Sequence, residues 1–292
     1  MKIAVVGLGS MGFGIASSLI RAGHAVTGMD VNPQTVDRLS AEGGVAVDAG
    51  ELDAMIVVVL NAAQTDAVLF GTNGIVPRMR AGSVVVCCVT VAPEFARRME
   101  ARCAECGVLY LDAPISGGSV KAAQGKLSIM ASGTAAAFAA ARPVLEATAE
   151  TIFELGDAAG TGSAMKAVNQ MLAGVHIAAM AEAITFGITQ GIAPETFLKV
   201  IPQCAGTSWM LQNRAPHVVT GDYTPRSAID IWPKDLGIIS DAARAAKFAA
   251  PLTAAALQQF LAASGMGLGR EDDAAVAKVY ACNAGLKLPG EG

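Results

Sequence analysis

Residues 2–30 read KIAVVGLGSMGFGIASSLIRAGHAVTGMD, and this stretch decides the fold. An apolar strand pattern at 2–6 runs into the glycine pattern GxGxxG at 7–12, and a helical pattern and a second strand ending in Asp30 follow. The glycine pattern alone is a weak signal, but its place between a strand and a helix is typical of a dinucleotide-binding unit. Such a helix directs its N-terminal backbone N–H groups toward the phosphates. The segment therefore predicts a nucleotide site.

The residues expected to hold the cofactor begin with the glycine pattern itself. Its first glycine permits a tight turn, its second lets the backbone approach the pyrophosphate, and its third lets the helix pack closely on the strand. Asp30 would accept hydrogen bonds from the adenine-ribose hydroxyls of NAD and would repel the 2′-phosphate of NADP, and no arginine follows it directly. We therefore predict NAD as the cofactor, held by Gly7, Leu8, Gly9, Ser10, Met11, Gly12 and Asp30.

The pattern of the chain changes near Gly156, and its 292 residues are more than one compact domain usually needs. Before Gly156, apolar runs without simple alternation are separated by helical patterns, which predicts a parallel sheet in a doubly wound α/β (Rossmann) domain over 1–160. The remainder predicts an all-helical domain over 161–292 that begins with a long interdomain helix. The expected strands are 2–6, 25–30, 54–60, 83–88, 109–112, 126–131 and 151–155, and the expected helices are 11–22, 33–41, 65–70, 93–106, 135–147, 163–190, 194–201, 234–246, 251–264 and 273–284.

Composition argues against several other classes of protein. Hydrophobic residues make up 53% of the chain and charged residues 16%, which favours a large core over disorder. The net charge of −4 offers no basic stripe, so nucleic acid is not an expected partner. The six cysteines and three histidines form no complete zinc set, so we expect no metal and the reduced thiols of a cytoplasmic protein. Glycines interrupt the N-terminal apolar run, and we expect neither a signal peptide nor a membrane span.

Four blocks of sequence, in order and at suitable spacing, resemble the β-hydroxyacid dehydrogenase family. They are residues 7–12 with Asp30 behind them, DAPISGG at 112–118, GTGSAMKAVNQ at 160–170, and Lys-Asp-Leu at 234–236. The family includes 3-hydroxyisobutyrate dehydrogenases and tartronate semialdehyde reductases, and the resemblance covers essentially the whole chain. It implies NAD-dependent oxidation of a small hydroxycarboxylic acid.

The resemblance also implies a role for each matching position. Lys166 aligns with the catalytic lysine of the family. The substrate-binding positions are Ser116, Gly117 and Gly118 for the carboxylate, together with Asn169, Gln170 and Lys234. The additional cofactor positions are Leu60, Asn61, Thr65, Thr90 and Lys234.

Three departures from the family pattern lie close to these positions. Asn61 replaces the usual proline, and Trp232-Pro233 is a less common lead-in to Lys234. Gln170 stands where many members have a second asparagine. Whether Asn169 or Gln170 contacts the substrate is therefore left open by the sequence.

Lys166 is the expected acid–base residue, because the substrate hydroxyl must lose a proton as its carbon loses a hydride. A lysine titrates near ~10.4, and burial beside a second cation would lower its pKa toward neutrality. We hypothesise that Lys234 is that cation. Asn169 and Gln170 follow Lys166 at i+3 and i+4, so all three are expected on one helix face.

The substrate class is narrowed by a further resemblance within the family. NAAQT at 61–65, GDYTPRSA at 221–228 and GREDD at 269–273 look like the L-threonate dehydrogenase branch, which oxidises four-carbon sugar acids. The alternatives are 3-hydroxyisobutyrate dehydrogenase or tartronate semialdehyde reductase activity and, from another class, a non-catalytic dinucleotide-binding module. Imine reductases of this fold typically lack the lysine. The alanine- and methionine-rich helical half predicts an oligomer, and the family resemblance implies a homodimer or homotetramer joined through that half.

Overall fold

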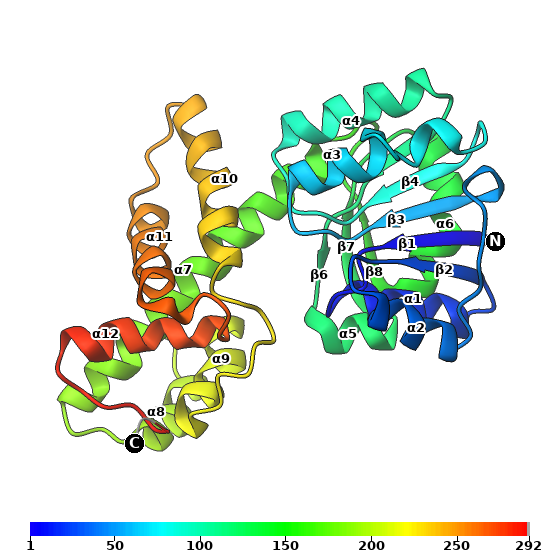
Figure 1. Ribbon diagram of the computed structural model, residues 1–292. Coiled ribbons are helices and arrows are strands. Elements are labelled where there is room, and N and C mark those ends of the chain that lie inside the picture. The colour runs from blue at the N-terminus through cyan, green and yellow to red at the C-terminus, as the bar shows by residue number, and fades with distance from the viewer. Residues whose placement is uncertain (291–292) are drawn as a thin grey trace. The chain divides into compact units, whose positions relative to one another are not determined.

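The computed structural model describes residues 1–290. The chain divides into two compact units, Met1–Lys166 and Ala167–Gly292. The first unit contains all the strands and the second is built from helices (Figure 1). The boundary that the sequence suggested, between residues 160 and 161, lies just before this division.

The first unit is built around a five-stranded parallel sheet in the order β2-β1-β3-β4-β5. β1, β3 and β4 lie in the centre and are buried on both faces apart from the first residue of β1, as their continuous apolar runs predict. β2 lies at an edge, and most of its residues are only half-buried. The strands are β1 (Lys2–Val6), β2 (Ala25–Met29), β3 (Ala54–Val57), β4 (Val84–Cys87) and β5 (Leu109–Asp112).

Helices cover both faces of this sheet (Figure 1). Alternate strand residues enter two separate cores: Ile3 and Val5 pack with α1 and α6, whereas Ala4 and Val6 pack with α3 and α4. This two-layer covering confirms the doubly wound α/β prediction. The helices are α1 (Gly12–Arg21), α2 (Pro33–Ala41), α3 (Ala62–Phe70), α4 (Pro93–Glu105), α5 (Gly118–Gln124) and α6 (Ala135–Thr148).

A second, three-stranded sheet was not anticipated. The sequence suggested one parallel sheet, but β7 (Leu127–Ala131) and β8 (Ala149–Glu154) pair in parallel with each other, and β6 (Ile115–Ser116) pairs antiparallel with β7. The two sheets meet at an isolated bridge between Asp112 and Ser132. β6 is only two residues long, too short for a periodic signal.

Among the described residues, the second unit contains helices joined by turns and loops and has no strand, apart from an isolated bridge between Ala228 and Asp272. Its apolar core includes Trp232 stacked on Phe260, with ring centroids 5.4 Å apart. The helices are α7 (Thr161–Thr189), α8 (Pro194–Val200), α9 (Trp209–Thr220), α10 (Ile231–Ala245), α11 (Pro251–Ala263) and α12 (Ala277–Asn283), with short turns at Ile201–Gln203, Ser264–Leu268 and Asp273–Val276. The sequence missed α5 and α9; α9 contains Pro216 and α5 begins at a glycine.

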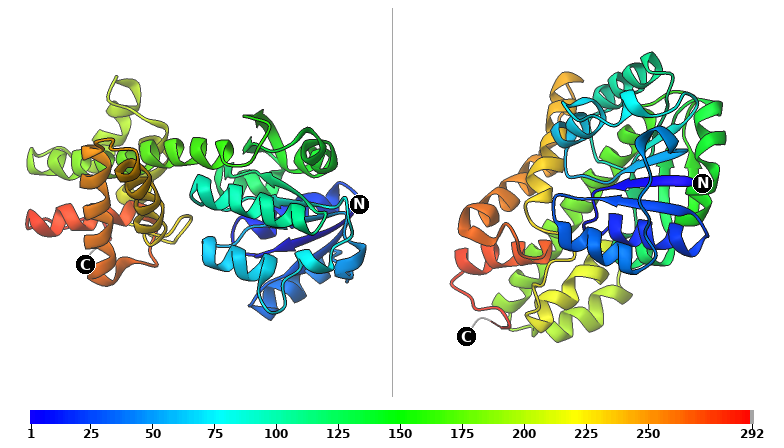
Figure 2. Two further views of the ribbon diagram at one scale, coloured as in Figure 1. Left: turned by 90° about the horizontal axis from the view of Figure 1, so that it is seen from above. Right: turned by 45° about the vertical axis from the view of Figure 1, so that its right-hand side comes forward.

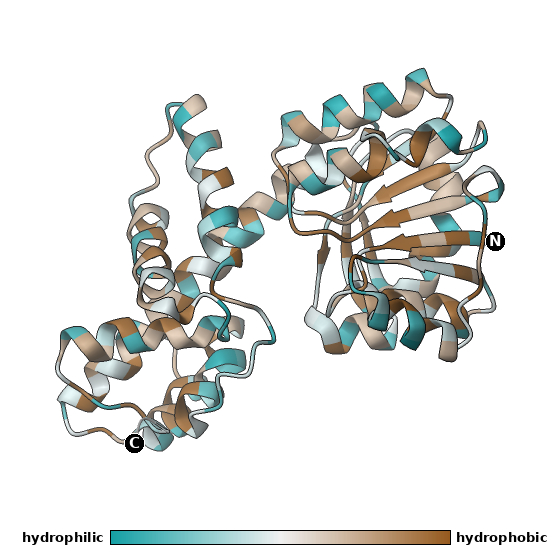
Figure 3. Ribbon diagram, viewed as in Figure 1, coloured by the Kyte–Doolittle hydropathy of each residue, from teal (hydrophilic) through white to brown (hydrophobic). Residues whose placement is uncertain are grey.

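Helix α7 begins in the first unit and continues through the second as one helix (Figure 2). By length and composition it could cross a membrane, and 44% of its most apolar window is buried inside the protein. This is weak evidence for a span, because a core helix of a globular protein passes the same test. Apolar residues are concentrated along the central strands and the inward faces of the helices (Figure 3).

A buried polar network joins two of the three segments that resemble the L-threonate branch, those at 221–228 and 269–273. His217 and Asp272 are joined at 2.8 Å between Nδ1 and Oδ1, and because an ionised carboxylate only accepts, the imidazole donates. Arg214 pairs with Asp273, which also accepts a 2.9 Å hydrogen bond from Trp232 Nε1. The side chains of both aspartates are fully buried. The backbone N–H of Arg226 also donates to Asp272 Oδ2 at 3.0 Å, so the motifs at 221–228 and 269–273 meet in one network beside the start of α10.

This network predicts an acid-sensitive step in the stability of the second unit. Burial alone would raise the pKa of Asp272, but the hydrogen bonds from His217 and from the backbone N–H groups of Arg226 and Ala274 outweigh it and lower the pKa to about 2. A depressed folded pKa contributes stability that is present above the ordinary aspartate value and is lost as the pH falls through the folded value. The contribution is about 2 kcal/mol and disappears between about pH 4 and pH 2.

Urea unfolding of wild type and Asp272→Asn across this range measures the effect. We expect the difference in free energy of unfolding between them to be largest near neutrality and to shrink as the pH falls below about 4. A difference that stays constant down to pH ~2.5 would show that the charge of Asp272 contributes nothing.

Candidate functional site

The glycine-rich turn after β1 has the tight geometry that its pattern predicts. Gly7 has a φ of +92°, in the left-handed region, and its N–H donates to the carbonyl of Met29 at 2.8 Å. A β-carbon on Gly12 would overlap the carbonyl oxygen of Gly7, so the start of α1 lies against the turn with no room for a side chain. A β-carbon on Gly9 would meet nothing within 4 Å. The turn is therefore closed toward the protein at Gly7 and Gly12 and open outward at Gly9.

Asp30 stabilises this turn from the end of β2. Its Oδ2 accepts a 2.6 Å hydrogen bond from the backbone N–H of Leu8, and its Oδ1 accepts one of 2.8 Å from Asn32. A carboxylate has about four acceptor positions, so it retains capacity for ribose hydroxyls. Ser10 is exposed and Met11 is half-buried at the N-terminus of α1.

These residues fit an NAD-type cofactor. The space at Gly9, the backbone N–H groups at the start of α1 and the half-buried carboxylate of Asp30 supply the three elements that a dinucleotide requires. Among residues 1–290, no group of three or more histidine, cysteine or acidic side chains could hold a metal ion. All six cysteines are free thiols.

The positions expected beside the nicotinamide lie between β3 and α3 and after β4. Leu60 is 65% exposed, and Asn61 caps α3 by accepting a 2.9 Å hydrogen bond from the N–H of Gln64. This cap explains how Asn61 replaces a proline at a helix start. Thr65 is fully buried, and its hydroxyl donates to the carbonyl of Asn61 at 2.9 Å. Thr90 is half-buried between β4 and α4, and the cofactor contacts of these four residues remain predictions.

Lys166 is buried and directed toward the loop that follows β5. Only 8% of the residue is exposed, and its Nζ donates to the carbonyl of Ile115 at 2.8 Å. The next residues of that loop are Ser116, which ends β6, and two glycines with φ values of +131° at Gly117 and +75° at Gly118. The ammonium group and the predicted carboxylate loop are thus adjacent within the first unit.

In the second unit, a chain of polar contacts joins α7 to α10. The Nε2 of Gln170 donates to Asp235 Oδ2 at 2.6 Å, and its Oε1 accepts from Asn169 Nδ2 at 3.0 Å. The other carboxylate oxygen of Asp235 pairs with Lys234 Nζ at 2.5 Å. Both ends of the Gln170 amide are therefore engaged, and Asn169 is the half-buried member of the pair.

This chain also bears on the hypothesis that Lys234 is a second cation for Lys166. Asp235 is 2% exposed, and its carboxylate compensates the positive charge of Lys234 within the second unit. A neutralised lysine would shift the pKa of another amine less than an isolated one would. The hypothesis remains untested.

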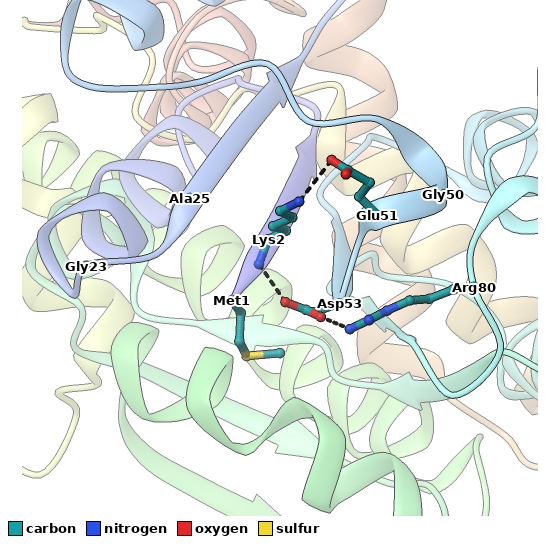
Figure 4. Close-up of a pocket in the computed structure, with 8 residues that line it drawn as sticks. All are labelled: Met1, Lys2, Gly23, Ala25, Gly50, Glu51, Asp53 and Arg80. Atoms are coloured by element: carbon teal, nitrogen blue, oxygen red, sulfur yellow. Dashed lines mark hydrogen bonds and ion pairs between the residues drawn. The ribbon is translucent and has the colours of Figure 1, made fainter.

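A hollow of about 560 Å³ lies elsewhere, at the amino ends of β1 to β3 (Figure 4). Lys2 pairs with Glu51 at 3.0 Å and Arg80 pairs with Asp53, so both of its basic side chains are already compensated. The glycine-rich turn follows the carboxyl end of β1, at the opposite edge of the sheet. We therefore assign no role in nucleotide binding to this hollow, which is lined by Met1, Lys2, Gly23, Ala25, Gly50, Glu51, Asp53 and Arg80.

Two buried carboxylates of the site were given no role by the sequence reasoning. Asp112 ends β5 and binds the start of α7, and Asp235 joins Lys234 to Gln170. The available signal was an acidic residue at the end of an apolar strand in one case and next to a candidate lysine in the other. Because buried acids require partners, a bonding partner could have been predicted for the carboxylate at each of these two positions.

Two family models together match nearly the whole chain. Residues 2–156 match the model described as the NAD binding domain of 6-phosphogluconate dehydrogenase. Residues 160–280 match the model described as NAD-binding of NADP-dependent 3-hydroxyisobutyrate dehydrogenase.

Individual proteins show similarity over the same length. L-threonate dehydrogenase of Cupriavidus necator is 49% identical, covering 99% of this chain and 98% of its own length. L-threonate dehydrogenase of Haemophilus influenzae is 45% identical, covering 100% of this chain and 98% of its own. The crystal structure of a 3-hydroxyisobutyrate dehydrogenase from Salmonella typhimurium has a TM-score of 0.91 at 46% identity, covering 96% of this chain and 99% of that one.

Proposed function

Because the chain belongs to the β-hydroxyacid dehydrogenase family, we propose that it oxidises L-threonate with NAD to the 2-oxo acid, 2-oxo-tetronate (2-dehydro-L-erythronate). The observation that carries the catalytic part is the buried Lys166 at 2.8 Å from the carbonyl of Ile115, next to the Ser116–Gly118 loop. The choice of L-threonate rests on the two L-threonate dehydrogenases at 49% and 45% identity. Carbohydrate-acid catabolism in the cytoplasm is the proposed setting.

The residues divide the chemistry between them. Bound NAD supplies the hydride acceptor. In the proposed mechanism Ser116 and the N–H groups of Gly117 and Gly118 hold the substrate carboxylate, since successive backbone N–H groups in a turn can bind an anion. Lys166, in its neutral amine form, takes the proton of the substrate hydroxyl and becomes an ammonium group. Asp30 and the glycine-rich turn hold the adenine-ribose and pyrophosphate.

The proposal extends to the partners of the chain. Apolar side chains on α7 are exposed, with Val168 at 53%, Leu172 at 54% and Phe186 at 64%, and they support a homodimer or homotetramer joined through the helical half. Neither nucleic acid nor a membrane is a proposed partner. 3-hydroxyisobutyrate oxidation is the second candidate activity, since the similar Salmonella typhimurium structure carries that name.

A substrate screen tests the function directly. Formation of NADH is followed at its absorbance band with L-threonate, D-threonate, the erythronates, D-glycerate, 3-hydroxyisobutyrate and 3-hydroxypropionate, each with NAD and with NADP. We expect L-threonate with NAD to give the highest kcat/KM. A clear preference for 3-hydroxyisobutyrate would select the second candidate, and no turnover with any acid would favour a non-catalytic nucleotide-binding module.

The same assay, with a measurement of thermal stability, tests whether Asn169 or Gln170 contacts the substrate. We propose that Asn169 contacts the substrate, because the Gln170 amide is bonded to Asp235 and to Asn169. Asn169→Ala should raise KM for the acid about tenfold, the value of one hydrogen bond to a charged group, and leave NADH binding unchanged. Gln170→Ala should cost about 1–3 kcal/mol of stability, because it removes a donor from a buried carboxylate. The reverse pattern in KM and thermal stability would assign the substrate contact to Gln170.

A further inference from the structure

The start of α7 is held by the ends of two strands. The first N–H groups of a helix have no partner within the helix itself. Here the N–H groups of Gly160 and Ser163 donate to Asp112 Oδ2 at 2.9 and 2.8 Å, and the Ser163 hydroxyl donates to Oδ1 at 2.7 Å. The N–H of Gly162 donates to Ser132 Oγ at 2.9 Å. Asp112 and Ser132 are each fully buried, so the sheet supplies the cap of this helix from within the core.

The two strand ends are themselves fixed to each other. The backbone N–H of Asp112 donates to the carbonyl of Ser132 at 3.0 Å, and the reverse bond is 2.8 Å. A β-carbon on Gly162 would overlap the carbonyl oxygen of Met130 and lie 2.8 Å from that of Asp112, so the helix touches both strand ends directly. The anchor is therefore rigid on the sheet side and in backbone contact on the helix side.

Lys166 lies close to this anchor along α7. Ser163 precedes it by three residues, so both side chains are on one face of α7. The carbonyl that Lys166 binds belongs to Ile115, three residues after Asp112. Asp112 thus contacts the start of the helix that carries the amine, and it directly precedes the loop that carries the acceptor of the amine. A carboxylate at this end of a helix is also favoured by the helix dipole.

We propose that Asp112 is the positioning residue for Lys166, setting the distance between the lysine and the Ser116–Gly118 loop by anchoring the start of α7. This inference rests on the proposed function, since it assigns Lys166 the proton transfer. The side chain of Asp112 bonds the start of α7 and its backbone begins the loop, so Asp112 acts on Lys166 through these two segments. Misplacement of a catalytic group by about 1 Å lowers turnover on the order of 10²-fold.

Three variants test this assignment. Asp112→Ala removes every acceptor, and kcat should fall at least about tenfold, with a changed pH profile and little change in NADH affinity. Asp112→Asn retains one carbonyl oxygen for the N–H groups of Gly160 and Ser163, while the Ser163 hydroxyl turns to accept from the amide, so most of kcat should return. Ser163→Ala removes a single bond, should fold even if Asp112→Ala does not, and should give an intermediate loss of kcat.

Thr134→Ala is the matched control, because Thr134 caps α6 in the same unit by accepting from Ala137 N–H at 3.2 Å. It should lower the melting temperature without changing kcat or its pH profile. Losses of kcat in the Asp112 and Ser163 variants that merely follow the fraction of folded protein, as in this control, would overturn the positioning role. So would an Asp112→Asn enzyme as slow as Asp112→Ala.

Amide hydrogen exchange distinguishes this inference from the proposed function, because it needs no substrate. Residues 160–167 should exchange at least about tenfold faster in Asp112→Ala or Ser163→Ala than in Thr134→Ala, and Asp112→Asn should exchange more slowly than Asp112→Ala. Unchanged exchange there refutes the anchor whatever the enzyme oxidises. Faster exchange, combined with a wild-type protein that oxidises none of the acids, supports the anchor and refutes the proposed function.

Discussion

Replacement of Lys166 by alanine should lower turnover by about 10²-fold or more while NADH binds as it does to wild type. The amine donates to the carbonyl of Ile115 at 2.8 Å, and this carbonyl holds the amine in place without itself exchanging a proton. Without the amine, the substrate hydroxyl must give its proton to water in a buried site. The glycine-rich turn and Asp30 lie on other elements and keep their geometry. NADH fluorescence titration and steady-state kinetics measure the two effects separately.

Two further lysine variants sharpen this result. Lys166→Arg keeps the positive charge but does not release its proton near neutrality, so it should be nearly as slow as alanine. Lys126→Ala removes an exposed lysine of the same unit and should leave kcat unchanged. Near-normal turnover in either Lys166 variant would remove the residue from the mechanism and leave a nucleotide-binding protein without an assigned base.

Local patterns predicted the first unit well because its elements are locally determined. β1 and β5 begin and end where their apolar runs do, and the N-cap and proline at Asn32 and Pro33 start α2 at the expected residue. The pairing of β7 and β8 in a separate sheet was missed, because partner choice depends on tertiary contacts that no run of residues encodes. β8 is mostly exposed, unlike a strand of the central sheet.

The site shows the same division between local and distant information. Motifs identified Lys166, the glycine-rich turn and the Ser116–Gly118 loop, each of which is contiguous in sequence. The role of Asp112 depends on hydrogen bonds to Gly160 and Ser163, 48 and 51 residues away. The engagement of Gln170 depends likewise on Asp235, 65 residues on. Sequence spacing could place Asn169 and Gln170 on one helix face but could not say which amide was already occupied.

The glycine-rich turn offers the second large effect, because its glycines are required for different reasons. Gly12 is closed in by the protein, where a β-carbon would overlap the carbonyl oxygen of Gly7. Gly9 faces open space, where a β-carbon would meet nothing within 4 Å. Gly12→Ala should therefore destabilise the fold by about 1–3 kcal/mol or more through overpacking. Gly9→Ala should leave stability unchanged and weaken NADH binding about tenfold or more, equivalent to about 1.4 kcal/mol.

Melting temperature and NADH titration, measured on both variants, separate these reasons. A methyl group at Gly9 occupies only the space that the pyrophosphate needs, so its cost appears when the nucleotide binds and not when the chain folds. A methyl group at Gly12 forces α1 away from the turn in the free protein, so its cost appears in both measurements. If Gly9→Ala binds NADH like wild type, the open side of the turn does not face the pyrophosphate, and the nucleotide must lie against another part of the first unit.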